Sequence, residues 1–467
     1  MLYSLSTITS SYNNERSIVC RKIVKNPLLL ARNLLSKICA ELFVFIKKVI
    51  TSADFIACHR QSEKDFTRQR KLPFHVLIAF LINFVRGSYQ DELDKFFKVL
   101  HRLDVPRRVV SKVALTKARM KVRFQVFIDL NHQLIAYFEK HFNPLTWHGF
   151  RLLAIDGSLI RLPQIKEIAE HFGVWRGRQG LPSAMARVSE LFDVLNKVTV
   201  GALLSPKSCG ERQLAAQHLL KLMPKDLVLL DRGYPAWWLF QLIISMDGHF
   251  CARISCTKWK AVRKFFYSNL TEKIICLPIH ATSVAACKEM GLDMQPLKLR
   301  LLRIHNGPEV QILITSLMDT QLYPIDIFSD LYHCRWPVEE DYKAIKCRME
   351  LENFSGKSVL SVYQDFHAKV FAKNMVSIMA LPINQDLKKN TEGRKRVYQV
   401  NFTQALSKSK GALALLLHET KSKIIRLVAE LFNIFQRTIE PIRPGRKYPR
   451  KHKISARKFF PQYKPIG

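Results

Sequence analysis

Residues 332–346 read Tyr-His-Cys-Arg-Trp-Pro-Val-Glu-Glu-Asp-Tyr-Lys-Ala-Ile-Lys, and this stretch organises the rest of the chain. If it forms one helix, its polar residues at offsets 0, 3, 7, 10 and 14 share a face: Tyr332, Arg335, Glu339, Tyr342 and Lys346. A helix that packs on a core would place Leu and Ile there instead. Pro337 predicts that the helix begins or kinks nearby. Taken alone, the segment is either a solvated charged face or a functional one.

Two other stretches each deliver an acid after an apolar run. Residues 151–163 read Arg-Leu-Leu-Ala-Ile-Asp-Gly-Ser-Leu-Ile-Arg-Leu-Pro, and residues 225–235 read Lys-Asp-Leu-Val-Leu-Leu-Asp-Arg-Gly-Tyr-Pro. This pattern is typical of a buried strand with an acid at its end. A lone Asp in such a place is most often a turn former or a helix cap. Asp156 and Asp231 together with Glu339, however, give three carboxylates on separate elements, which a two-metal phosphoryl-transfer site requires.

These motifs resemble the DDE transposases of bacterial insertion sequences, specifically the insertion-sequence-four type. The signature of that family is Tyr, two residues, Arg, three residues, Glu, six residues, Lys. Tyr332, Arg335, Glu339 and Lys346 match this spacing without a gap. The contexts Asp156-Gly-Ser and Asp231-Arg-Gly-Tyr resemble those of the first and second catalytic Asp. The resemblance covers roughly residues 75–380.

The resemblance implies an enzyme that cuts at the ends of an insertion sequence and joins the freed 3′-hydroxyl to target DNA. It assigns Asp156, Asp231 and Glu339 to two Mg²⁺ ions, for which Mn²⁺ may substitute. It assigns Tyr332, Arg335 and Lys346 to DNA phosphates. Glu340 is the nearest competitor for the metal, but on a helix it points about 100° away from the shared face. The implied partner is double-stranded DNA, bound by a homodimer at the nucleoid in the bacterial cytoplasm.

The composition agrees with a globular protein that binds a polyanion. Lys and Arg number 74 against 38 Asp and Glu, a net charge of +36, and 48% of the residues are hydrophobic. Such an excess of positive charge favours nucleic acid, although membrane-surface and ribosome-associated proteins can be equally basic. The ten cysteines form no Cys-x-x-Cys pair, which indicates reduced thiols. We expect no membrane span, because charges interrupt the apolar residues 28–50.

Residues 1–145 are predicted to be a helical DNA-binding region. An apolar helix over residues 74–85 ends at a Gly-Ser break, a second helix starts at Tyr89, and Ser111 is a plausible N-cap of a basic third helix. Residues 89–123 therefore fit a helix-turn-helix. They fit a helical bundle with a solvated basic face equally well. If the segment reads DNA, the contacting residues are Lys112, Lys117 and Arg119.

Residues 146–380 are predicted to be an α/β catalytic domain. We expect strands over 152–155, 159–162 and within 191–204, then a helix over 211–222 and a strand that ends at Asp231. This is the order of an RNase H-like core, a mixed sheet flanked by helices, and the resemblance implies the same fold. The 107 residues between Asp231 and Glu339 are too many for one crossover loop, which predicts a β-rich insertion at about 245–320.

Two basic segments outside the motifs are candidates for DNA contact. Lys258, Trp259 and Lys260 place an aromatic ring among cations, which suits a clamp on DNA but also a solvated hairpin tip. Residues 381–467 are predicted to be a helical, basic C-terminal region with a linker at 385–396. Residues 443–464 contain nine Lys or Arg and no acid, which predicts a flexible tail that touches DNA.

Two rival functions stay open at the level of sequence. One is a catalytically inactive DNA-binding protein derived from a transposase, and the other is an RNase H-like nuclease without strand transfer. The presence of all three carboxylates argues against the first. Joining of a cleaved 3′ end to a target separates transposase from nuclease.

Overall fold

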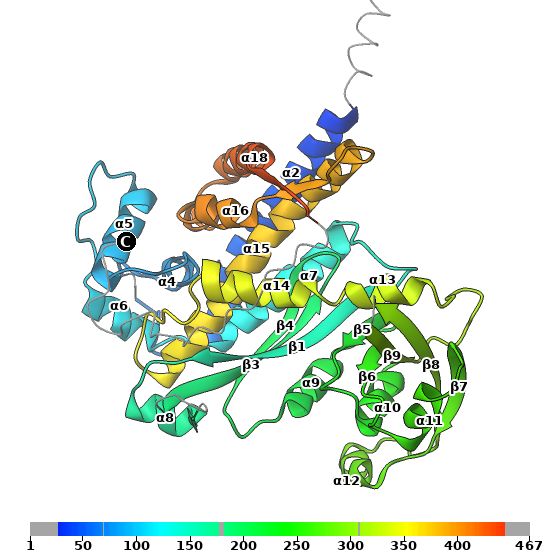
Figure 1. Cartoon of the computed structure of the whole chain (residues 1–467). Coiled ribbons are helices and arrows are strands. Elements are labelled where there is room, and N and C mark those ends of the chain that lie inside the picture. The colour runs from blue at the N-terminus through cyan, green and yellow to red at the C-terminus, as the bar shows by residue number, and fades with distance from the viewer. Residues whose placement is uncertain (1–26, 69, 177–181, 307–308, 444–467) are drawn as a thin grey trace, which may run out of the picture.

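The computed structural model describes residues 27–443 except 69, 177–181 and 307–308. Within these residues a mixed sheet of nine strands runs through the molecule (Figure 1), in the order β4-β3-β1-β5-β6-β9-β8-β7, with β2 paired to the start of β3. The strands are β1 (Arg151–Arg161), β2 (Val174–Trp175), β3 (Ser183–Asp193), β4 (Val198–Ser205), β5 (Asp226–Leu230), β6 (His249–Ile254), β7 (Glu272–Leu277), β8 (Leu297–Asn306) and β9 (Glu309–Thr315).

The first five strands of this order form an RNase H-like core. β1, β3 and β4 are antiparallel neighbours, and β5 and β6 run parallel to β1. Parallel strands need crossover helices, and the chain supplies them as α9 (Glu211–Leu219) before β5 and α10 (Trp237–Ser245) before β6. The predicted fold class is confirmed.

One expectation within this core was wrong. Residues 152–155 and 159–161 lie on a single strand, β1, because β3 pairs with β1 continuously from Leu153 to Arg161. Gly157 therefore stays in the ladder, opposite Ser189, and does not make a turn.

The segment after β6 extends the same sheet. β9 pairs with β6, and β8 and β7 follow antiparallel, so the three strands prolong the sheet beyond the RNase H-like core. This segment also contains α11 (Lys260–Phe266) and α12 (Ala281–Met290), whereas α8 (Lys166–Phe172) follows β1 and packs on β3.

The two faces of the sheet bury different helices. On β1, Leu152, Ala154 and Ile160 belong to a large core, whereas Leu153 and Ile155 belong to a smaller one. Figure 1 shows α9 and α10 on one side of the sheet and α14 (Pro337–Lys343) on the other. Asp156 has the parity of Ala154, so its side chain is on the α14 side.

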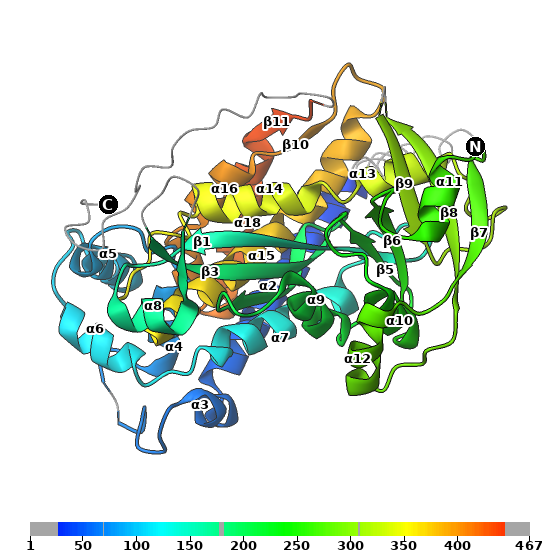
Figure 2. The ribbon, with the colours of Figure 1, turned by 60° about the horizontal axis from the view of Figure 1, so that its bottom comes forward.

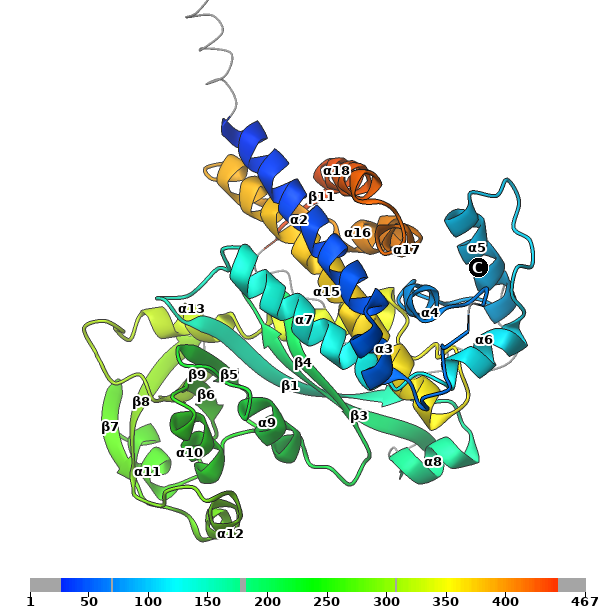
Figure 3. The same ribbon diagram turned by 180° about the vertical axis from the view of Figure 1, so that it is seen from behind.

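Helices from both ends of the chain pack together and supply many of the residues of the large core. The N-terminal helices are α2 (Pro27–Thr51), α3 (Ala53–His59), α4 (Phe74–Leu81), α5 (Tyr89–His101), α6 (Lys112–Arg119) and α7 (Gln125–His141). The elements after the sheet are α13 (Ile327–His333), α14, the π-helical η1 (Ala344–Arg348), α15 (Val359–Thr391), α16 (Phe402–Ser409), α17 (Ala412–Leu416) and α18 (Lys421–Arg437), with a β10 (Tyr398–Val400) and β11 (Ile439–Pro441) pair. Figures 2 and 3 show α2 lying along α15, and α18 packs on α2.

Two further expectations concern this helical layer. The linker expected at 385–396 is largely the end of α15, because Leu387 packs against the core and its carbonyl oxygen accepts a hydrogen bond from Thr391. The tail expected at 443–464 lies outside the described residues, apart from Arg443. Among the helices that are described, none combines the length and the apolar character that a membrane crossing requires.

Candidate active site

The register of the sheet brings Asp156 and Asp231 side by side. Ile155 and Leu230 form the last pair of the parallel β1–β5 ladder, and the next residue on each chain is an Asp. Both have the parity that faces α14. Asp231 follows the end of its strand as predicted. Asp156 instead lies within β1, at the point where β1 loses β5 as a neighbour but keeps β3.

Helix α14 brings Glu339 over this pair. The helix is anchored by the Tyr342 hydroxyl, which donates a 2.8 Å hydrogen bond to the Asp156 carbonyl oxygen. Burial raises the pKa of the Asp156 carboxyl to about 6, the Gly157 amide and Arg335 oppose this rise, and the negative charges of Glu339 and Asp231 add to it. The negative charges of Glu339 and Asp231 therefore lie near enough to Asp156 to favour its protonated form.

The signature residues do not lie on one regular helix. Tyr332 is on α13, which ends at His333, and Arg335 is in the turn before α14. Glu339 is on α14, which begins at Pro337 as predicted, and Lys346 is in the π-helical η1. The residues expected on a single helical face therefore come from four consecutive segments: α13, the turn, α14 and η1.

The signature cations are engaged with protein groups. Arg335 Nη2 lies 2.7 Å from Glu339 Oε1, and the two side chains are 10% and 24% exposed. Lys346 Nζ donates to Ser158 Oγ and, over 2.7 Å, to the Leu159 carbonyl oxygen, both on β1. Burial lowers the pKa of the Lys346 ammonium. The Tyr332 hydroxyl is buried and has no hydrogen-bond partner among the described residues.

The donor set suits a hard divalent cation, because all three candidate ligands are carboxylates. Within the described residues, however, no three His, Cys, Asp or Glu side chains lie close enough together to hold an ion. Glu339 is paired with Arg335 in this arrangement.

Four of the six candidate DNA contacts in the other segments are exposed. They are Lys112 and Lys117 on α6 and Lys258 and Lys260 at the start of α11. Trp259 is partly buried against the smaller core, edge-on to Phe240 at 6.0 Å between ring centroids.

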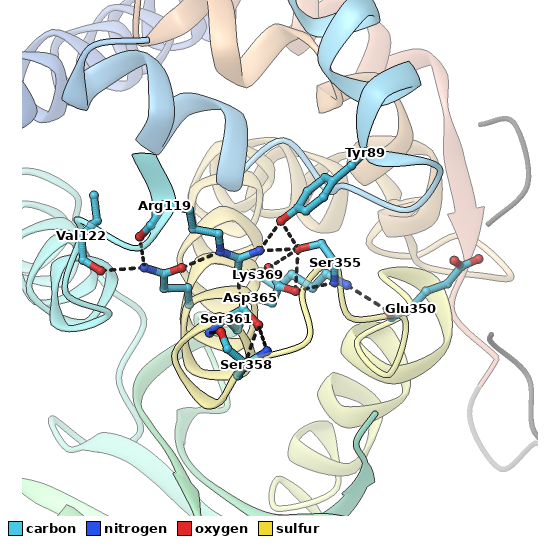
Figure 4. Close-up of polar contacts among 10 residues, drawn as sticks. Tyr89, Arg119, Val122, Glu350, Ser355, Ser358, Ser361, Asp365 and Lys369 are labelled. Atoms are coloured by element: carbon cyan, nitrogen blue, oxygen red, sulfur yellow. Dashed lines mark hydrogen bonds and ion pairs between the residues drawn. The ribbon is translucent and has the colours of Figure 1, made fainter. Parts of the chain in front are cut away.

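The expectation for Arg119 must be corrected. Figure 4 shows its guanidinium inside the protein, where Nη2 lies 2.7 Å from Asp365 Oδ1 on α15. It also donates to Tyr89, Ser355, Gln364 and the carbonyl oxygen of Ser361. Because Arg119 is 4% exposed and its donors are occupied, it joins α5 and α6 to α15 and is not presented to DNA.

Three residues beside the site escaped the sequence interpretation. Glu190 on β3 lies directly opposite Asp156 in the β1–β3 ladder and has no exposed surface. Burial and the nearby Asp341 raise the pKa of Glu190 well above its ordinary range. Asp341 on α14 binds Lys373 of α15, which also has no exposed surface. The available signal was that Lys373 lies in a largely apolar helical stretch, residues 366–380, where a buried lysine needs a partner.

Comparison with known proteins finds similarity to transposases. The Transposase DDE domain family matches residues 147–375. The chain is 23% identical over 404 residues to the transposase InsG for insertion sequence element IS4 of Escherichia coli (strain K12), over 84% of this chain and 88% of the relative. Among solved structures it is similar to the piggyBac transposase synaptic complex with hairpin DNA, with a TM-score of 0.45, 10% identity and 87% of each chain covered.

The core is RNase H-like, Asp156 and Asp231 follow the last pair of the β1–β5 ladder, and Glu339 is on α14. Together with the family match, these features define a DDE transposase, an enzyme of DNA transposition that depends on divalent metal ions. Within that class, the chain is similar to a transposase of the insertion-sequence-four type.

Proposed function

We propose that Asp156, Asp231 and Glu339 hold two Mg²⁺ ions, or Mn²⁺ in their place, for cutting and joining at the element ends. The observation that carries this assignment is the register of β1 and β5, which makes the two Asp residues neighbours below Glu339. Bound divalent ions supply an activated water and offset charge on the phosphate that is transferred.

The other signature residues are proposed to position the DNA strand. Arg335 offers a planar fork that suits a phosphate, and its exchange of Glu339 for a phosphate leaves Glu339 available to the ions. Tyr332 has a hydroxyl to donate. Lys346 fixes η1 to β1 and places positive charge two residues from Asp156 along the strand. The nucleophile is water in cleavage and the freed 3′-hydroxyl in joining, so no protein–DNA covalent bond is needed.

Binding of the double-stranded element ends is assigned to the regions outside the core. Residues 1–145 would contact the ends through the exposed Lys112 and Lys117, and the insertion would contact them through Lys258, Trp259 and Lys260. Two copies of the chain are proposed to hold a pair of ends. The mass of the complex with end DNA in light scattering tests this point, and one copy per pair of ends would contradict it.

A cleavage assay on DNA that carries the flanking inverted repeats tests the site. Asp156→Ala, Asp231→Ala and Glu339→Ala should each abolish cleavage and leave end binding largely intact, because each removes a metal ligand. The matched control is Glu340→Ala, on the same helix but 54% exposed and paired with Lys343, and it should cleave normally. Normal cleavage by Glu339→Ala together with loss in Glu340→Ala would show that the helix was assigned one residue out of place.

A further inference from the structure

The helix that carries Glu339 is too short to be stable by itself. α14 has only seven residues, between the turn at 334–336 and the π-helical η1, and isolated helices of this length are unstable in water. Its direction must therefore come from tertiary contacts. Two have been described, the Tyr342 hydrogen bond and the Lys346 hydrogen bonds, and both reach β1. A third attaches α14 to α15.

The third contact is a buried ion pair between Asp341 and Lys373. Lys373 Nζ lies 2.7 Å from each carboxylate oxygen of Asp341 and 2.6 Å from the hydroxyl of Thr199 on β4. These three acceptors match the three hydrogens of an ammonium group. Lys373 has no exposed surface, so its charge depends on these partners.

The neighbour of Lys373 on α15 is hydrogen-bonded to β4 and α7. Asn374, the residue after Lys373, accepts a 2.9 Å hydrogen bond from the Thr199 amide and donates a 2.8 Å bond to the Thr199 carbonyl oxygen. It also donates to Asn131 of α7 over 2.7 Å. Hydrogen bonds to β4 and α7 thus fix the position of the part of α15 that carries Lys373.

The pair also lies beside the catalytic carboxylates. Glu190 is directly opposite Asp156 in the β1–β3 ladder, and its neighbours include Asp341. Side chains directly opposite in such a ladder have Cβ atoms about 5 Å apart. Asp156, Glu190 and Asp341 therefore form a row of acids, and Lys373 supplies positive charge from the interior.

We propose that Lys373 and Asp341 are positioning residues for transposition, because their ion pair holds α14 so that Glu339 faces Asp156 and Asp231. This inference rests on the proposed function, since it takes Glu339 as a metal ligand. Asp341 is two residues beyond Glu339 on a helix and so projects from a different side, toward the interior.

The test is the double variant Asp341→Leu with Lys373→Met, which removes both charges and keeps the interior apolar. It should fold, because replacement of a buried pair by apolar residues is often tolerated. Its Kd for end DNA should be unchanged, and its single-turnover cleavage rate should fall roughly 10–100-fold, since a misplacement of about 1 Å can have that effect. Its affinity for Mn²⁺ without DNA, measured by electron paramagnetic resonance, should also fall.

Three companion variants make the outcome decisive. Glu340→Gln with Lys343→Gln removes an exposed acid–lysine pair from the same helix, and its cleavage and Mn²⁺ binding should match the parent. Glu339→Gln separates the two proposals: if it cleaves normally, the proposed site is wrong. If Glu339→Gln is inactive but the double variant cleaves and binds Mn²⁺ as the parent does, the positioning role is wrong.

Asp341→Asn, which preserves shape, replaces the double variant if the latter does not fold. Parental cleavage by Asp341→Asn would then overturn the inference, as would a loss of DNA binding equal to the loss of cleavage in either variant.

Discussion

Replacement of Arg119 by Met should destabilise the protein without weakening DNA binding per folded molecule. The guanidinium lies 2.7 Å from Asp365 Oδ1, from Ser355 Oγ and from the Ser361 carbonyl oxygen, and the paired Arg119 and Asp365 side chains are only 5% and 7% exposed. Removal of one partner leaves Asp365 as a buried charge. Such a loss typically costs about 3–5 kcal/mol, a large part of the roughly 5–15 kcal/mol that stabilises a folded protein.

The same pair predicts a dependence on pH. Burial alone would raise the pKa of Asp365, but Arg119 and Lys369 outweigh it and hold this pKa below its ordinary value. A carboxyl with a depressed pKa stabilises the fold above its unfolded pKa, about 3.9, and the contribution is lost as pH falls through the folded value. In Arg119→Met burial raises the pKa of Asp365, so this carboxyl takes up a proton at a higher pH in the variant than in the parent. The stability difference between parent and variant should therefore be largest at high pH and shrink as pH falls through the raised pKa of the variant.

Urea unfolding at several pH values measures this effect, with filter binding to end DNA alongside. Arg119→Met with Asp365→Leu should recover most of the loss, because the unpaired charge is gone. Lys117→Met, exposed on the same helix, is the matched control and should do the opposite, with unchanged stability and weaker DNA binding. An Arg119→Met variant as stable as the parent but weaker on DNA would refute the buried role.

Three further outcomes are expected. Burial lowers the pKa of His367 to about 3, so the neutral ring stabilises the fold above about pH 6.5. The unfolding free energy should drop by about 2 kcal/mol between pH 6.5 and 5. In urea unfolding, His367→Phe should flatten the midpoint-versus-pH profile in this range, and an unchanged slope would contradict the prediction. A Cβ at Gly356 would lie 2.4 Å from Ser361 Cβ and Oγ, so Gly356→Ala should lower stability by about 1–3 kcal/mol in thermal melts, whereas an unaltered melt would show that the loop adjusts freely. Lys346→Met should lose cleavage more than end binding and melt slightly lower, because η1 loses its attachment to β1; parental cleavage would count against any role in the site.

Local patterns predicted the acids but not their surroundings. The apolar runs before Asp156 and Asp231 and the polar signature around Glu339 are features of neighbouring residues, and they identify strands and a helix start. Glu190 has no such signature, and Lys373 is visible only as a lysine in a largely apolar helix, because the residues that bury and pair them lie far away in the sequence. The prediction that Arg119 contacts DNA was wrong for the same reason. An Arg among other basic residues on a helix predicts a solvated or DNA-facing side chain, and only the contact with α15 shows that Arg119 is buried.

The spacing of Tyr342 and Lys346 also corresponds to positions along β1, which a helical wheel does not show. Tyr342 bonds the carbonyl oxygen of Asp156 and Lys346 bonds that of Leu159, so the catalytic segment runs along β1 in the strand direction. Four residues of helix rise about 6 Å, whereas three residues of strand advance about 10 Å. The long Lys346 side chain spans this difference, and a shorter residue at that position would leave η1 unattached. The interval between Tyr342 and Lys346 therefore reflects how α14 and η1 lie along β1.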